Sequence, residues 1–189
     1  MFPFDKVIIT CWICFWLYWL ISAFGSKKNT TPRIKRFIGV RLGLFVLAII
    51  IFRSFNRQSY SFENHYQTTN NEVVLVIGFL MFLFGLILAI WARIYLGRNW
   101  GTPMSQKQDP ELVTSGPYHY IRHPIYTGIL LATLGSFFAS SIYWLPFFII
   151  SGIYFVYSAV VEERLMMKQF PKIYPSYRDK TKMFIPFIF

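Results

Sequence analysis

Charged side chains are scarce in this sequence. They make up 14% of the 189 residues, whereas 55% of the residues are hydrophobic and 21% are aromatic. A soluble domain of this length needs a larger share of polar surface, so the composition argues against a soluble protein. It favours a chain that is largely embedded in a membrane.

Acidic residues are the scarcer charge type, with 8 Asp and Glu against 19 Lys and Arg and a net charge of +11. Such an excess can indicate a nucleic-acid partner, but no recognition motif or continuous basic stripe accompanies it. The basic residues stand in short blocks between apolar stretches, as in loops that face anionic lipid. We therefore expect a lipid bilayer as partner and no nucleic acid.

Cysteine is nearly absent as well. The two cysteines, Cys11 and Cys14, form "CWIC" inside the first apolar run, far from all three histidines. Redox or zinc chemistry at a CxxC pair needs polar, accessible surroundings and, for zinc, further ligands. The pair is interpreted as two small residues that face lipid or a neighbouring helix, and no metal site is expected.

Long apolar runs are what the sequence does contain. A helix needs about 20 apolar residues to cross a bilayer, because its backbone groups must be hydrogen-bonded within the segment. By this measure we predict an all-α, polytopic membrane fold with the last two helices forming a hairpin. The five predicted helices cover residues 7–24, 38–55, 73–96, 124–139 and 142–161.

The distribution of basic residues predicts the orientation of these helices. The positive-inside rule places the basic side in the cytoplasm, which puts the C-terminus there and the N-terminus outside. The other side receives only Lys6, Arg53 and Arg57, while Arg41 lies one turn inside the second span. With five spans, 15 of the 19 basic residues share one side: Lys27, Lys28, Arg33, Lys35, Arg36, Arg93, Arg98, Lys107, Arg122, Arg164, Lys168, Lys172, Arg178, Lys180 and Lys182.

A first polar cluster, "GPYHYIRHPIYTG" at residues 116–128, precedes the fourth apolar run. Pro124 disfavours helix at His123 and suits the first helical position, so we expect the helix to begin at Pro124. A helix start presents unpaired N–H groups and a positive end, which favour a ligand carboxylate. The alternative is a membrane-interface belt, with tyrosines at headgroup level and Arg122 against lipid phosphate.

A second polar cluster, "VVEERLMMKQFPKIYPSYRDK" at residues 160–180, places Glu162 and Glu163 directly after the fifth apolar run. Adjacent helical residues point about 100° apart, so one glutamate can face inward while the other is solvated. The alternative is that both simply cap the run at the water boundary. An inward carboxylate suits hydroxyl or ammonium groups of a ligand, whereas this pair makes a poor metal site.

Together, "LGRNWG", "ELVTSGPYHYIRHPIYTG" and "EERLMMKQFPKIYPSY", within residues 96–177, resemble the isoprenylcysteine carboxyl methyltransferase family, to which phospholipid methyltransferases are related. The resemblance implies an integral membrane methyltransferase that uses S-adenosylmethionine, bound on the cytoplasmic side between the two clusters. We accordingly expect a methyltransferase core over residues 73–189. Residues 1–72 would supply two further membrane helices that carry no motif.

Carried over by position, the resemblance also implies the residues that line the cofactor pocket. Leu112 and Val113 would pack on adenine, the helix start would receive the methionine carboxylate, and Glu162 would accept from ribose hydroxyls or from the ammonium group. Tyrosine faces attract a sulfonium cation. No catalytic residue is assigned, because methyl transfer from a sulfonium proceeds mostly by alignment and exclusion of water. The implied pocket residues are Glu111, Leu112, Val113, Tyr118, His123, Pro124, Ile125, Tyr126 and Glu162.

The acceptor depends on one departure from the family pattern. In members that methylate prenylcysteine, the resemblance places an arginine one helical turn before the first glutamate, where it meets the substrate carboxylate. Ser158 stands there in this chain, and a neutral hydroxyl cannot replace a charge-assisted bond. We therefore predict transfer to a lipidic or small apolar acceptor. The alternatives are a prenylcysteine carboxyl methyltransferase proper, or a non-enzymatic membrane transport or structural subunit.

Overall fold

The computed structural model describes residues 4–23, 68–100 and 111–186, and these form an all-α fold as predicted. The predicted span at 38–55 lies outside the described residues, and the other four predicted spans are confirmed as helices. Within the described ranges the sole β pairing is an isolated parallel bridge between Ile121 and Lys182. The long helices are α1 (Phe4–Ala23), α3 (Glu72–Leu96), α4 (Pro124–Ala139) and α5 (Trp144–Gln169), followed by the short α6 (Tyr174–Lys180).

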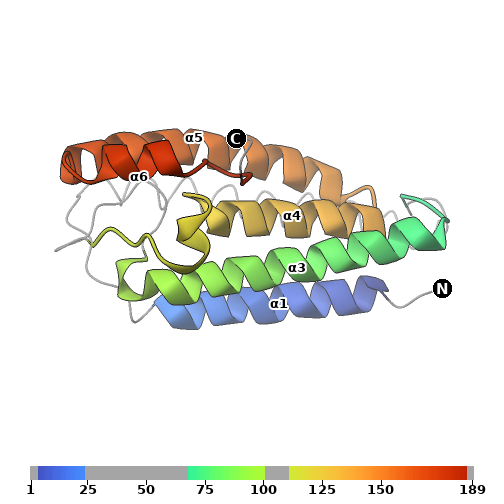
Figure 1. Cartoon of the computed structure of the whole chain (residues 1–189). Helices are drawn as coiled ribbons and strands as arrows, with labels where there is room; N and C mark the ends of the chain where they lie inside the picture. The colour runs from blue at the N-terminus through green and yellow to red at the C-terminus, as the bar shows by residue number, and fades with distance from the viewer. Residues whose placement is uncertain (1–3, 24–67, 101–110, 187–189) are drawn as a thin grey trace.

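The helices form a membrane-spanning bundle in which α4 lies between α3 and α5 (Figure 1). Helix α1 packs against both α3 and α4. Three segments, Phe4–Ser22, Glu72–Asn99 and Trp144–Gln169, are long and apolar enough to cross a membrane. The chain is therefore an integral, multi-pass membrane protein. Most side chains of α4 are buried, whereas α5 buries only Ser158, Ala159 and Glu163, as expected for a central helix and a helix that faces lipid.

Glycines bring α3 and α4 into close contact. A methyl group on Gly78 would lie 2.7 Å from the Ala139 nitrogen, and one on Gly128 would lie 2.6 Å from the Gly85 carbonyl oxygen. Such distances leave no room for any larger residue, which is the packing that small residues allow between membrane helices. This contact fixes the end of α3 relative to the start of α4, where the polar clusters lie.

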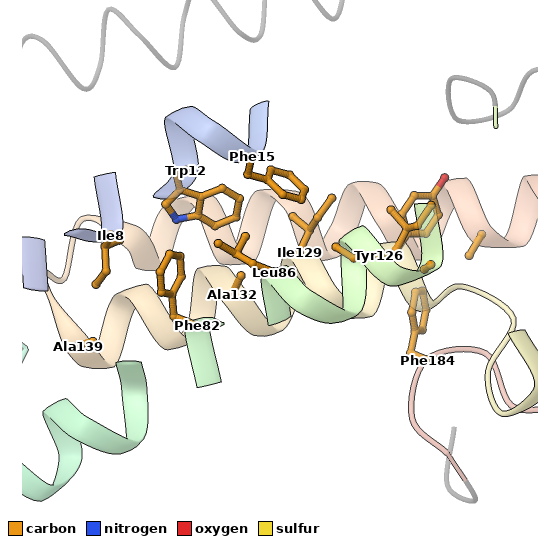
Figure 2. Packing of buried hydrophobic residues seen from close by; sticks show 14 of the residues in the cluster. Ile8, Trp12, Phe15, Phe82, Leu86, Tyr126, Ile129, Ala132, Ala139 and Phe184 are labelled. Atoms are coloured by element: carbon orange, nitrogen blue, oxygen red, sulfur yellow. The ribbon is translucent and has the colours of Figure 1, made fainter. Parts of the chain in front are cut away.

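The N-terminal helix is attached to the bundle through aromatic packing and one polar contact. Trp12 stacks on Trp144 at a centroid distance of 5.7 Å, and its indole N–H donates to the Ser136 hydroxyl at 3.1 Å. Figure 2 shows Trp12 beside Phe82 in the buried cluster formed by α1, α3 and α4. An indole N–H within the bundle needs such a partner, since an unsatisfied donor is costly there.

Arg93 ties α1 and α3 together at the end of the bundle that carries the polar clusters. Its guanidinium donates to the Ser22 carbonyl at 2.6 Å and the Gly97 carbonyl at 2.8 Å, and it lies 4.7 Å from the Trp100 ring centroid. Both carbonyls belong to C-terminal helix ends, whose partial negative charge stabilises a buried cation. Arg93 therefore has a structural role in joining two helices.

The helix ends determine which charged residues share one end of the bundle. Helices α1, α3 and α5 end, and α4 begins, at one end of the bundle, which we call the site end (Figure 1). We expect the site end to face the cytoplasm, because Arg98, Arg122 and Arg164 accompany these helix ends while Lys6 lies at the opposite end. A reporter fused to the C-terminus should therefore be active only in the cytoplasm. Activity restricted to the outer face would contradict this orientation.

Candidate functional site

The start of α4 is set by a proline. Pro124 is the first helical residue, as predicted, and His123 before it has φ −124° and ψ 56°, outside the helical region. A 3₁₀ turn, η2 (Gly116–His119), leads into this point. Gly116 has φ +60°, and a Cβ there would lie 2.5 Å from the Tyr95 ring, so glycine both permits the turn and lets it lie against α3.

His123 lies between the two glutamates of α5. Its Nδ1 is 3.6 Å from a Glu162 carboxylate oxygen, and its Nε2 is 3.5 Å from a Glu163 carboxylate oxygen. The prediction left open whether one glutamate is solvated or both cap the helix. The structure shows instead that both reach one imidazole, with the Glu162 side chain 24% exposed and the Glu163 side chain 7% exposed.

Tyr126 joins the same cluster from the first turn of α4. Its hydroxyl donates to Glu162 at 2.6 Å. Its ring is parallel to the His123 imidazole at a centroid distance of 5.5 Å and stacks on Phe155 of α5 at 4.5 Å. The three rings form a row that leads from the α4–α5 contact to the site end, so the aromatic faces and the partly exposed carboxylate lie side by side.

Arg122 occupies the other side of Glu163. Its Nε lies 2.7 Å from the Glu163 carboxylate, and its NH1 donates to the carbonyls of Arg178 and Thr181. The Arg122 and Glu163 side chains are 9% and 7% exposed. An ion pair at this depth is retained only if both charges are matched and hydrogen-bonded, as they are here.

The predicted residues Glu111, Leu112 and Val113 lie in a second neighbourhood at the end of α3. They lie outside any helix or strand, and the Asn99 amide donates to Glu111 at 3.4 Å. This neighbourhood is an open hollow of about 540 Å³, lined by Tyr95, Leu96, Gly97, Arg98, Asn99, Glu111, Leu112, Val113, Thr114 and Ser115.

Tyr118 lies between the two neighbourhoods. It is buried within electrostatic range of both Glu162 and Arg93, and burial raises the pKa of its phenol well above the usual value, so the ring stays neutral at physiological pH. Its backbone carbonyl accepts a hydrogen bond from the Tyr177 hydroxyl at 2.7 Å. Val113 packs against the hydrophobic core to which Tyr118 and Tyr126 also belong.

Of the predicted residues, the structure thus gathers His123, Tyr126 and Glu162 in one cluster and Glu111, Leu112 and Val113 in the hollow. Pro124 is fully buried, and the Ile125 side chain packs in the core. No role in the site was predicted for Phe155. For Glu163 the sequence left open whether it faces inward or is solvated, and for Arg122 it left open whether the side chain orients the loop or contacts a lipid headgroup. The sequence does contain a signal for this ion pair. Arg122 and His123 are neighbours in the first polar cluster, and the oppositely charged Glu162 and Glu163 are neighbours in the second.

Comparison with known proteins identifies the family of this chain. The sequence model of the family described as phospholipid methyltransferase matches residues 73–173, which include nearly all of α3, all of α4, the first polar cluster and the part of the second that holds Glu162 and Glu163. The chain belongs to the phospholipid methyltransferase family. The resemblance to the isoprenylcysteine carboxyl methyltransferases, inferred from the motifs, is confirmed by the relatives.

The relatives of this chain include a methyltransferase and two metal resistance proteins, as judged by their names. The protein-S-isoprenylcysteine O-methyltransferase of Xenopus laevis is 31% identical over 117 residues, 60% of this chain and 41% of that protein. A nickel-cobalt-cadmium resistance protein of Alcaligenes xylosoxydans xylosoxydans is 26% identical, over 61% of this chain and 51% of its own length. A cobalt-zinc-cadmium resistance protein of Cupriavidus metallidurans is 28% identical, over 61% of this chain and 50% of its own length.

A solved structure supports the same fold for the family member. The eukaryotic intramembrane Ras methyltransferase, isoprenylcysteine carboxyl methyltransferase, superposes with a TM-score of 0.61 at 22% identity, over 77% of this chain and 53% of that one. At this identity the likeness concerns the fold. The chain spans about half the length of the relatives it matches, so their activities do not transfer to it as a whole.

Proposed function

We propose that this protein is an integral membrane enzyme that transfers a methyl group from S-adenosylmethionine to a lipidic or small apolar acceptor. Residues 73–189 would form the methyltransferase core, with the site end in the cytoplasm. The observation that carries the proposal is the cluster at the start of α4, where His123, Tyr126 and Glu162 lie together in a chain of the phospholipid methyltransferase family. A purely structural subunit would leave this mostly buried polar cluster unexplained.

The residues of the site fit the chemical groups of this cofactor. The Nε2 atom of His123 is buried and meets only the Glu163 carboxylate at 3.5 Å, without a well-formed hydrogen bond. The imidazole lies directly before a helix start whose N–H groups favour a carboxylate. The partly exposed Glu162 carboxylate suits ribose hydroxyls or the ammonium group. Leu112 and Val113 supply apolar surface for adenine in the hollow at the end of α3.

When bound, the cofactor would supply a methyl group on an activated sulfonium, so the protein does not have to activate the donor. The faces of Tyr118 and Tyr126 would attract the sulfonium cation. The row of rings from His123 to Phe155 would exclude water and hold the reacting groups in line. The apolar outer surface of α5 faces lipid and gives an acceptor a route to the site within the bilayer.

This proposal predicts two measurable properties. The protein, purified in detergent, should bind S-adenosylhomocysteine in calorimetry. It should also transfer radiolabelled methyl groups from S-adenosylmethionine into at least one of three acceptor pools, namely a whole-membrane lipid extract, a prenylcysteine analogue, or small thiols. A protein that neither binds S-adenosylhomocysteine nor labels any of these pools would instead support the structural or transport alternatives.

A further inference from the structure

We propose that Arg122 and Glu163 are a positioning pair, which fastens the segment at residues 181–184 over the start of α4 and thereby sets His123 for its ligand. We call this segment the clasp. The inference rests on the proposed function, which it extends by giving Glu162 and Glu163 different roles. Glu162 would face the ligand, whereas Glu163 would never touch it.

The clasp is joined to the loop before α4 through backbone groups. The Arg122 N–H donates to the Lys182 carbonyl at 2.8 Å, and the His123 N–H donates to the Met183 carbonyl at 3.1 Å. The Thr127 hydroxyl donates to the Phe184 carbonyl at 2.9 Å. Contacts over residues 121–127 therefore bind three consecutive clasp residues and align them with the first turn of α4.

The Arg122 side chain anchors the point where the clasp begins. Its guanidinium donates to the carbonyls of Arg178 and Thr181, the last of which directly precedes Lys182. Glu163 holds this guanidinium in place at 2.7 Å, and a second cation, Arg178, approaches Glu163 at 3.5 Å with a side chain that is 53% exposed. Arg122 is thus the buried link between the end of α5 and the clasp.

His123 is held from several sides by this construction. The Phe184 ring lies 5.9 Å from the imidazole on the clasp side, and Tyr126 stacks on it from α4. The two glutamates bracket its ring nitrogens from α5. If the Arg122–Glu163 pair is broken, the clasp is no longer anchored and the imidazole loses its contact with Phe184. No group proposed to contact the ligand is removed by this change.

The consequence for the two glutamates can be tested by removing one charge at a time. Loss of Glu163 leaves Arg122 as a buried cation without its partner, and loss of Arg122 leaves a buried carboxylate, so either change should loosen the same clasp. Because both variants break one pair, their effects on ligand affinity should coincide in the double variant rather than add.

The first measurement is the affinity for S-adenosylhomocysteine of Glu163→Gln, Arg122→Gln and the double variant. We expect each to bind about five- to tenfold more weakly than the parent, with the double variant no weaker than either single variant, since they act through one interaction. Arg122→Lys keeps the charge but cannot make the same set of hydrogen bonds, so its affinity for S-adenosylhomocysteine should lie between those of the parent and Arg122→Gln. Arg164→Gln is the matched control, because it removes an exposed charge next to Glu163 and should leave the affinity unchanged.

The second measurement reports the clasp without any ligand. Met183→Cys is introduced into a protein in which Cys11 and Cys14 are replaced by serine. The new thiol is then reacted with a water-soluble maleimide. Labelling should be about tenfold faster in Glu163→Gln and in Arg122→Gln than in the parent, because the clasp opens more often when its anchoring pair is broken. Arg164→Gln should label at the parent rate.

The two measurements separate the possible failures. Faster labelling with unchanged affinity would overturn the positioning role and leave the pair a structural anchor alone. Unchanged labelling in both variants would overturn the clasp itself. A parent protein that binds no S-adenosylhomocysteine, yet shows faster labelling in the variants, would instead contradict the proposed function while the clasp stands.

Discussion

Replacing His123 or Glu162 by alanine is expected to weaken S-adenosylhomocysteine binding by about ten- to hundredfold. Each side chain offers one charge-assisted contact, and the loss of such a contact costs about 1.5–3 kcal/mol. The expected loss exceeds that for Glu163, because Glu162 is partly exposed toward a ligand while Glu163 is covered by Arg122. Isothermal titration calorimetry in detergent measures the effect directly.

Matched controls exist for both changes. His119→Ala removes an exposed histidine from the turn just before the site, and Glu72→Ala removes an exposed carboxylate from the opposite end of the bundle. Both should bind with parent affinity. Tyr126→Phe keeps the ring but removes the hydrogen bond to Glu162, so it should lower affinity less than Glu162→Ala. Parent-like affinity in His123→Ala and Glu162→Ala, with both proteins folded, would remove these residues from the site.

The sequence determined the start of α4 to the residue, because Pro124 ends one conformation and begins another by sterics alone. It was less informative at the end of α5. The apolar run stops at Val161, but the helix continues to Gln169, since Glu, Arg, Leu, Met and Lys all favour helix without being apolar. An apolar run therefore locates the part of a helix inside the membrane rather than the whole helix.

The contacts of the clasp could not be predicted from the sequence. Its backbone bonds join Arg122 to Lys182 and His123 to Met183 across the whole of α4 and α5, and no local pattern in residues 181–184 specifies a partner. The Arg122–Glu163 pair is similar, since many arginines stand near the site end and the sequence does not choose among them. Tertiary packing makes that choice by placing the turn of α5 that carries Glu162 and Glu163 beside the first turn of α4.

The acceptor prediction depends on the charges around Ser158. This residue is fully buried one turn before Glu162, and its hydroxyl makes no hydrogen bond. The resemblance places a carboxylate-binding arginine at this position in prenylcysteine-methylating members. Two nearby cations are already engaged, because Arg93 donates to helix-end carbonyls and Arg122 pairs with Glu163. Arg98 and Arg164 are exposed, and Arg164 lies about 9 Å along the helix from Ser158 by its rise.

Among the described residues, a prenylcysteine carboxylate bound beside Ser158 would therefore meet the Glu162 carboxylate and no free buried cation. An unpaired charge in a desolvated site costs several kcal/mol, so we expect carboxyl methylation of a farnesylcysteine analogue to be at least about a hundredfold less efficient than methylation of an uncharged thiol or an amine headgroup. Radiolabelled methyl transfer, measured as kcat/KM for each acceptor at saturating S-adenosylmethionine, gives the comparison. The Ser158→Arg variant is the matched test, because it supplies the missing cation. If charge decides the acceptor, this variant should show a smaller difference in kcat/KM between the farnesylcysteine analogue and the other acceptors. Saturable, efficient methylation of the farnesylcysteine analogue by the parent protein would show that another group meets the carboxylate, and the acceptor would then be a prenylcysteine after all.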